Sequence, residues 1–165
     1  MASEMAEVGE IRVTAYRAGG FLTADSGYSP HLRALGTDGN SHVLVAVTSW
    51  PAGAGRPGDT IIGTIMLRQW PHAGEIVTSP DEAEIRALAV LPEAQGAGVG
   101  SALLRAVIGR AAGRAVRHLV LYTEPEMRIA HRIYERAGFA RLPGRDRSPA
   151  PEFLLLAYGL RLDAD

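Results

Sequence analysis

Short runs of alternating hydrophobic and polar residues mark the first half of the chain. The alternation at 11–16 predicts a first strand, and the apolar runs at 42–48 and 61–70 predict two more. These three segments together predict an antiparallel meander. Residues 21–36 combine spaced apolar positions with an internal proline, which predicts short helical pieces. The polar and small residues at 1–9 are predicted to be disordered.

The second half alternates strand-like and helix-like patterns. A buried strand is predicted at 85–90, a helix at 98–113, and a nearly continuous apolar strand at 118–123. Because strand, helix and strand follow one another here, the two strands are predicted to be parallel. The Thr-x-x-Glu pattern at 123–126 predicts the start of another helix. Two more strands are predicted after it, at 139–142 and 153–162.

These elements predict an α/β fold with a mixed, α+β type of sheet. The sheet is expected to hold about seven strands, with a central parallel pair and helices on both faces. A chain of 165 residues has the length of one domain, so residues 1–165 are predicted to form a single domain.

The loop between the strand at 85–90 and the helix at 98–113 holds the clearest chemical signal. Gly96, Gly98 and Gly100 stand at alternate positions where the loop enters the helix. The first N–H groups of a helix have no internal acceptor, and the helix dipole is positive there. Glycines also let an anion approach the backbone itself. The loop is therefore predicted to bind a phosphorylated ligand, and a glycine-rich turn without a ligand is the alternative.

Two common phosphate-binding motifs do not fit this loop. A nucleotide-triphosphatase loop needs a lysine after its last glycine, and the chain contains none, because all 17 basic residues are arginine. A dinucleotide fingerprint needs Gly-x-Gly-x-x-Gly, but counting from Gly96 the sixth position is Ser101.

The run Gln95-Gly96-Ala97-Gly98-Val99-Gly100 does resemble the acetyl-coenzyme A pyrophosphate loop of the GNAT superfamily of N-acetyltransferases. A second segment agrees, since Ala130, Tyr134 and Gly138-Phe139 resemble the family's later Asn-x-x-Ala-x-x-x-Tyr-x-x-x-Gly-Phe pattern. One position departs from the pattern: Met127 stands where the family commonly has an Asn that helps to hold the cofactor.

The resemblance implies a cofactor, acetyl-coenzyme A, and residues that hold it. The main chain at Leu88, Ala89 and Val90 would orient the pantetheine arm. The pyrophosphate would be held by the loop and the first turn of the helix, that is, by Gln95, Gly96, Ala97, Gly98, Val99, Gly100 and Ser101.

The resemblance also implies two catalytic residues. Acetyl transfer to an amine needs a base for the ammonium proton and an acid for the leaving thiolate. Glu84 occupies the position of a catalytic carboxylate in part of the family and is the candidate base; the alternative is a structural carboxylate paired with Arg86 or Arg68. Tyr134 is the candidate acid, and its alternative is a core aromatic on the apolar stripe of its helix.

The sequence gives weaker signals for the pocket that would bind the acetyl acceptor. Tyr28, Trp70 and His72 lie on segments that could line an acceptor pocket, although a lone His or Trp at a strand end is more often structural. The five histidines are scattered, which predicts no metal site.

Composition and charge narrow the function classes. The chain has no cysteine and no apolar run long enough for a membrane helix, so it is predicted to be cytoplasmic. A net charge of −1 argues against nonspecific nucleic-acid binding. Residues 1–99 carry 6 arginines against 11 acidic residues, whereas residues 100–147 carry 10 against 4. This asymmetry suits a polyanionic cofactor on one side and a cation on the other.

The function predicted from the sequence is transfer of the acetyl group of acetyl-coenzyme A to a primary amine of a small molecule or a protein. The partner is therefore a small-molecule or peptide amine, with no nucleic acid and no membrane, and a homodimer is left open. The alternative is a coenzyme A-binding sensor without turnover. A nucleotide-binding α/β domain is disfavoured by the failed motifs.

Overall fold

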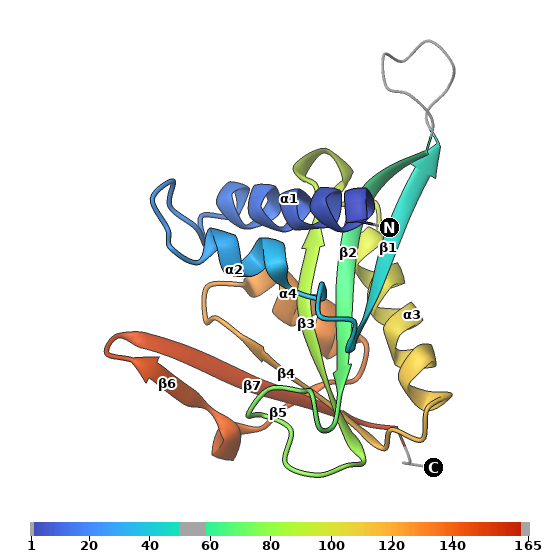
Figure 1. Ribbon diagram of the computed structural model, residues 1–165. Coiled ribbons are helices and arrows are strands. Elements are labelled where there is room, and N and C mark those ends of the chain that lie inside the picture. The colour runs from blue at the N-terminus through green and yellow to red at the C-terminus, as the bar shows by residue number, and fades with distance from the viewer. Residues whose placement is uncertain (1, 50–58, 163–165) are drawn as a thin grey trace. The chain divides into compact units, whose positions relative to one another are not determined.

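The computed structural model of the chain describes residues 2–49 and 59–162 (Figure 1). Its α-helices are α1 (Ala2–Ala18), α2 (Ser29–Ala34), α3 (Val99–Ala112) and α4 (Arg128–Arg136), with 3-10 turns η1 (Pro92–Ala94) and η2 (Pro143–Arg145). Its strands are β1 (Ser41–Ser49), β2 (Asp59–Gln69), β3 (Glu82–Val90), β4 (His118–Thr123), β5 (Ala140–Arg141), β6 (Arg147–Ala150) and β7 (Phe153–Arg161). None of the helices in these ranges has both the length and the apolar character that crossing a bilayer requires.

The strands form a seven-stranded mixed sheet in the order β1-β2-β3-β4-β7-β5, and β6 pairs with β7. β3 and β4 are parallel, as predicted, with Glu82, Ala83 and Glu84 opposite His118, Leu119 and Val120. β4 and β7 are antiparallel. The predicted strands at 42–48, 61–70, 85–90, 118–123, 139–142 and 153–162 and the helix at 98–113 are all confirmed within a few residues.

The prediction for the N-terminus is wrong. Residues 2–18 form α1, so residues 2–9 are helical instead of disordered, and residues 11–16 are not a strand. The buried positions Val8, Ile11, Arg12 and Ala15 recur at helical spacing. Arg12 makes the pattern resemble strand alternation, yet its side chain is fully buried. The Arg12 Nη1 donates to the carbonyls of Leu32 (3.3 Å) and Leu35 (2.6 Å), at the C-terminal end of α2, where carbonyls lack helical partners.

The predicted start of the fourth helix is also wrong. α4 begins at Arg128, and Met127 precedes it without a side-chain cap. Thr123 instead ends β4, and its buried hydroxyl has no hydrogen-bond partner among the described residues. The capping box therefore does not form, because Thr123 remains in the strand.

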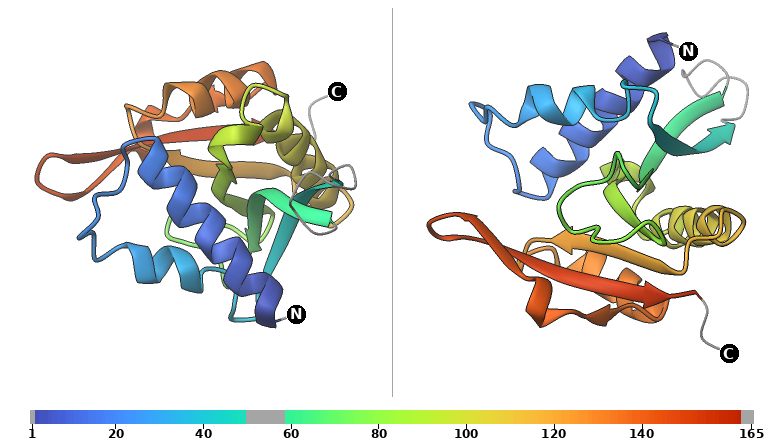
Figure 2. Two further views of the ribbon diagram at one scale, coloured as in Figure 1. Left: turned by 90° about the horizontal axis from the view of Figure 1, so that it is seen from above. Right: turned by 60° about the horizontal axis from the view of Figure 1, so that its bottom comes forward.

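The chain forms two compact units, Met1–Met66 with Ala87–Leu103 and Leu67–Arg86 with Leu104–Asp165. In the first unit, α1 and α2 pack on the face of β2 that presents Met66. The opposite face presents Gly63, where an added Cβ would lie 3.2 Å from Val99 and 3.1 Å from Leu103 of α3. Helices therefore cover both faces of β2 in this unit (Figure 2).

In the second unit, alternation along β7 separates two layers. Tyr158 faces α4, with its ring 6.3 Å from that of Tyr134. Ala157 faces the other way and packs with Val120, Ile76 and Val77. The latter two belong to the connection between β2 and β3, here named the 70–81 loop, which covers this face of the sheet.

A buried ionic network ties the 70–81 loop to the sheet. The Oε1 of Glu82 lies 2.8 Å from His118 Nδ1 and 2.8 Å from Arg145 Nη1. The Oε2 accepts hydrogen bonds from the backbone N–H (2.8 Å) and the hydroxyl (3.0 Å) of Thr78. Burial opposes ionisation of Glu82, but the donors of Thr78, His118 and Arg145 outweigh it and lower its pKa from 4.5 to about 2. His118 Nδ1 must carry its proton, since an ionised carboxylate can only accept.

We predict that this network makes folding stability depend on pH in the acid range. A carboxyl whose pKa falls from 4.5 to about 2 on folding stabilises the protein by on the order of 3 kcal/mol above pH 4.5, and this contribution is lost as the pH falls from 4.5 through 2. Urea unfolding of the wild type and Glu82→Gln between pH 7 and pH 2 tests this. The two curves should differ most at neutral pH and converge on acidification.

A matched control is Glu10→Gln, which removes the ion pair with Arg33, where the two side chains are 60% and 40% exposed. Exposed pairs contribute little, so this variant should follow the wild type within about 1 kcal/mol. Parallel curves for wild type and Glu82→Gln would contradict the assignment.

Candidate functional site

The glycine loop that follows β3 has a backbone that only glycine adopts readily. Gly96 and Gly98 both have φ of +80°, in the left-handed region. A Cβ built on either residue would meet nothing within 4 Å, so the space beside this backbone is open. Gln95 braces the loop, since its side-chain amide donates to the carbonyl of Val90 at 3.1 Å.

Where the loop enters α3, the first backbone N–H groups of the helix are left without an acceptor inside the helix. The first helical hydrogen bond runs from the Ala102 N–H to the Gly98 carbonyl at 2.9 Å. Gly98 is therefore the N-cap, and the N–H groups of Val99, Gly100 and Ser101 have no acceptor within the helix. α3 is 14 residues long, so its dipole adds positive potential at this end. Gly96 and Gly98 are exposed, whereas Gly100 is buried. The loop and the first turn of α3 are here named the N–H cradle (residues 96–101), and their open donors suit a phosphate group.

Gly63 is a contributor that the sequence-based prediction missed. Its absent side chain lets Val99 and Leu103 of α3 approach β2, and the carbonyl of Ala89 would lie 3.1 Å from an added Cβ. The position of the N–H cradle on the first unit depends on this close approach. The signal was a glycine within an apolar strand, which often marks close backbone packing.

Leu88, Ala89 and Val90 form the last part of β3. Ala87, just before them, has φ of +52°, which is unusual for a residue with a side chain and interrupts the regular strand. The pairing of β3 with β4 ends at Glu84 and Val120, before this irregularity.

Glu84 is almost completely buried on β3, in the second unit. Its Oε2 accepts a hydrogen bond from the N–H of Gly74 at 2.8 Å, and its Oε1 lies 3.7 Å from the Nε of Arg86. The alternative reading of Glu84 as a partner of Arg86 therefore has geometric support. The contact with Gly74, from the 70–81 loop, was not predicted.

Tyr134 is also buried in the second unit, on α4. Its ring centroid lies 5.9 Å from that of Phe139 and 6.3 Å from that of Tyr158. These contacts agree with the alternative of a core aromatic, and they also fix the position of the ring.

Glu84 and Tyr134 belong to opposite faces of the sheet in this unit. Glu84 stands opposite Val120, which faces the 70–81 loop, whereas Tyr134 packs on Tyr158, which faces α4. The two predicted catalytic residues are therefore separated by the strands of the sheet in this structure.

Tyr122 lies on the same face of β4 as Val120 and is half-buried. Burial is the main cause that raises the pKa of the Tyr122 phenol; the guanidinium of Arg147 lowers it, and the carboxylates of Glu75 and Glu84 raise it further. The face of the sheet on which both Glu84 and Tyr122 lie is therefore lined by both apolar and charged groups.

The three residues predicted for the acceptor side are not brought together by any contact that the structure records. Tyr28 is 45% exposed in the first unit and stacks on His31, with ring centroids 5.0 Å apart. Trp70 is 50% exposed and His72 is exposed, both at the start of the 70–81 loop in the second unit.

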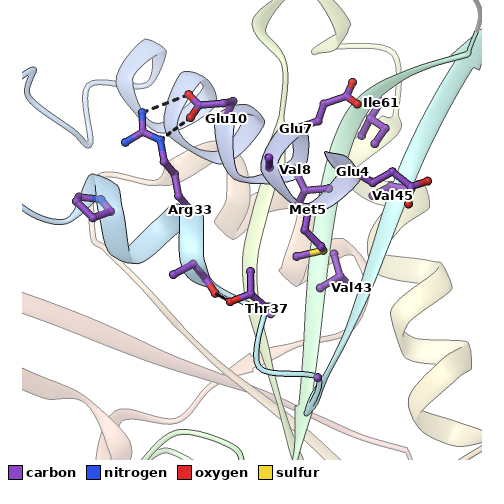
Figure 3. Close-up of a pocket in the computed structure, with 15 residues that line it drawn as sticks. Glu4, Met5, Glu7, Val8, Glu10, Arg33, Thr37, Val43, Val45 and Ile61 are labelled. Atoms are coloured by element: carbon purple, nitrogen blue, oxygen red, sulfur yellow. Dashed lines mark hydrogen bonds and ion pairs between the residues drawn. The ribbon is translucent and has the colours of Figure 1, made fainter. Parts of the chain in front are cut away.

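A groove of about 1140 Å³ opens in the first unit (Figure 3). It is lined by α1, α2, the turn before β1, and residues of β1 and β2, among them Glu7, Val45 and Ile61. None of the predicted site residues lines it. Within residues 2–49 and 59–162, no three side chains of the kinds that bind metals gather closely enough to hold an ion.

Solved structures share the fold. An acetyltransferase of the GNAT family from Staphylococcus aureus Mu50 aligns over 98% of this chain and 94% of its own, with a TM-score of 0.71 at 18% identity. The ribosomal-protein-S18-alanine N-acetyltransferase of Escherichia coli aligns over 100% and 92%, with a TM-score of 0.67 at 18% identity. The PaiA N-acetyltransferase of Thermoplasma acidophilum, in complex with coenzyme A, aligns over 94% and 92%, with a TM-score of 0.65 at 13% identity.

Curated relatives match about half of the chain. A mycothiol acetyltransferase of Cellulomonas flavigena is 36% identical over 83 residues, which are 49% of this chain and 24% of the relative. The N-alpha-acetyltransferase 30 of Schizosaccharomyces pombe is 31% identical over 83 residues, or 50% of this chain and 53% of the relative. The chain thus spans about a quarter of the length of the first of these and about half of the second.

The family model of the acetyltransferase (GNAT) family matches residues 15–139. This range includes the N–H cradle, Glu84 and Tyr134, and it covers most of the chain. The architecture of the structural neighbours agrees with it. The chain belongs to the acetyltransferase (GNAT) family.

Proposed function

We propose that the protein is an N-acetyltransferase that transfers the acetyl group of acetyl-coenzyme A to a primary amine of a small molecule or a protein. The observation that carries the proposal is the N–H cradle, in which Gly96 and Gly98 adopt φ of +80° beside the open donors of α3. Acetyltransferases of this family use acetyl-coenzyme A, and the Thermoplasma acidophilum neighbour was crystallised with coenzyme A.

The chain's own backbone fits this cofactor. The pyrophosphate would be held by backbone N–H groups of the N–H cradle, that is, by those of Gly96, Ala97, Gly98, Val99, Gly100 and Ser101. The hydrogen bond from the Gln95 side chain to the Val90 carbonyl would stabilise the conformation of the loop. The main chain of Leu88, Ala89 and Val90 would hold the pantetheine arm. When bound, acetyl-coenzyme A supplies the activated acetyl group.

Two side chains would transfer protons during the reaction, one as a general base and one as a general acid. Glu84 would take the proton of the acceptor ammonium, either directly or through water, so that the amine becomes nucleophilic. Tyr134 would supply a proton as the thiol leaves, with its ring held by Phe139 and Tyr158.

The acceptor is a primary amine, for which Tyr28, Trp70 and His72 are candidate contacts. The names of the Schizosaccharomyces pombe relative and of the Escherichia coli neighbour point to protein N-terminal amines, so peptides with a free N-terminus are the first acceptors to test. Small amines form the second set. Release of free thiol from acetyl-coenzyme A, measured against both sets, identifies the acceptor class.

A coenzyme A-binding sensor without turnover is the second candidate. It is favoured by the structural contacts of both candidate catalytic residues, Glu84 with Arg86 and Tyr134 with Phe139. Binding of acetyl-coenzyme A without thiol release for any amine would support the sensor.

The organisation of the chain is part of the proposal. Residues 1–165 would act as one acetyltransferase domain, which is supported by a family match that continues from 15 to 139. We propose the cytoplasm as its compartment, where acetyl-coenzyme A and primary amines are both present.

Gly98→Val should weaken binding of acetyl-coenzyme A about tenfold or more, roughly 1.4 kcal/mol. A side chain at φ of +80° is strained, and it would stand in the open space beside the N–H cradle. Calorimetric titration of the folded variant measures the change. Gly109→Val is the matched control, because Gly109 lies on the same helix and also faces open space, but without a positive φ. Equal affinity for Gly98→Val and wild type would remove the pyrophosphate assignment.

Glu84→Gln and Tyr134→Phe should each lower kcat by about 10²-fold and leave the affinity for acetyl-coenzyme A nearly unchanged, because each removes a proton-transfer group and keeps the shape of the side chain.

For Glu84→Gln the loss of kcat/KM should be largest below neutral pH and partly recovered at alkaline pH, where the amine is already neutral. The pH profile of kcat/KM is the measurement. Tyr158→Phe, which removes a neighbouring hydroxyl bonded to Glu135 at 3.2 Å, is the control and should stay within about threefold. Superimposable profiles for wild type and Glu84→Gln would return Glu84 to a structural role.

A further inference from the structure

The carboxylate of Glu84 is held from the 70–81 loop. The N–H of Gly74 donates to Glu84 Oε2 at 2.8 Å. A Cβ on Gly74 would lie 2.8 Å from the same oxygen and 3.1 Å from the other, so the loop approaches the carboxylate as closely as glycine allows. This contact makes the orientation of Glu84 depend on the conformation of the loop.

The Gly74 turn is continuous with the segment that the ionic network holds. The N–H of Val77 donates to the Gly74 carbonyl at 3.1 Å. The next residues are fixed from outside the loop: Arg145 Nη1 donates to the Ile76 carbonyl at 3.3 Å, and Thr78 is bonded to Glu82 through both its N–H and its hydroxyl. The loop is therefore fixed immediately after the turn that contacts Glu84.

Glu82 is the centre of this network. It is 4% exposed, and it joins the loop (Thr78), β4 (His118) and η2 (Arg145) through one carboxylate. Removing its charge would leave the partly buried guanidinium of Arg145 and the buried side chain of His118 without their anionic partner, which weakens the network. A second tie between loop and sheet, the ion pair of Glu75 with Arg147, has side chains that are 71% and 43% exposed and contributes little.

We propose that Glu82 is a positioning residue for acetyl transfer. Through Thr78 and Arg145 it holds the 70–81 loop so that the N–H of Gly74 fixes the Glu84 carboxylate toward the acceptor amine. The inference rests on the proposed function for the role of Glu84, but the hold on the loop is a property of the free protein. It assigns Glu82, two positions before Glu84 on the same face of β3, a role in turnover without contact with substrate.

The first test follows the Gly74 amide directly and needs no ligand. Hydrogen exchange measured by NMR should be at least tenfold faster at Gly74 in Glu82→Gln than in the wild type. The Leu142 amide, which donates to the Ala157 carbonyl at 2.8 Å in the same unit, is the internal reference and should change less than twofold. Arg147→Gln, which breaks the exposed tie, is the matched control and should leave Gly74 unchanged. Unchanged exchange at Gly74 in Glu82→Gln would overturn the proposal.

The second test asks whether Glu82 acts through Glu84. With acetyl-coenzyme A and the amine identified by the acceptor screen, Glu82→Gln should lower kcat at least tenfold with an unchanged KM for acetyl-coenzyme A. In a Glu84→Gln background, the same change should alter kcat less than twofold. Equal losses in both backgrounds would mean a general structural role and would overturn the proposal.

The two tests separate this proposal from the proposed function. If no amine supports thiol release, the proposed function fails, and the Gly74 exchange still decides whether Glu82 holds the loop. If Glu82→Gln does not fold, Arg145→Gln replaces it in both tests, since it leaves the pair of Glu82 with His118 in place and removes the bonds to Ile76 and Glu82.

Discussion

The open N–H groups at the start of α3 are the feature on which the proposed cofactor site depends. A helix cannot satisfy its first donors internally, and side chains usually do so. Here the N-cap is Gly98, which has no side chain to offer, and it is preceded by Gly96 in the same left-handed conformation. A Cβ built on either of these glycines would meet nothing within 4 Å, so the space beside this part of the backbone is open. Because Gly63 admits α3 close to β2, the donors also stand at a fixed place on the first unit.

The second unit holds both candidate catalytic residues, Glu84 and Tyr134, in buried positions. Glu84 and Tyr134 take opposite faces of the sheet because residues alternate along the strands. Each is held by neighbours, Tyr134 by a pair of aromatic rings and Glu84 by a backbone N–H from the loop above it. Buried and positioned groups of this kind suit catalysis, since little reorganisation is needed when charge moves. The network around Glu82 extends this support from the sheet into the loop.

The parts of the fold that local pattern determines were predictable from the sequence. The apolar strand at 118–123, the helix at 98–113 and the glycine loop each follow from short-range rules, and the βαβ order then gives the parallel pair. The N-terminal helix was not predictable in this way. Arg12 was counted as a polar position in the strand-like alternation at 11–16, whereas it is buried in a helix because the end of α2, far away in the sequence, provides carbonyl acceptors.

The same distinction applies to the candidate site. The residues of the N–H cradle could be identified from glycine spacing and family resemblance, but Gly63 could not, because its importance comes from a helix packed against it. Thr123 satisfied a capping pattern and yet remains in β4, since strand pairing with β7 extends through this residue. Glu82 had no motif of its own, and only the contacts with Thr78, His118 and Arg145 reveal it.

The most direct test of the central claim is a titration of the isotope-labelled protein with coenzyme A, followed by amide NMR. We expect the largest shift changes at the amides of Gly96, Gly98, Val99, Gly100 and Ser101. Pantetheine, which lacks the pyrophosphate, should leave these amides unchanged at the same concentration. Saturation with coenzyme A that shifts other amides and leaves those of the N–H cradle unperturbed would show that the cradle does not bind the pyrophosphate.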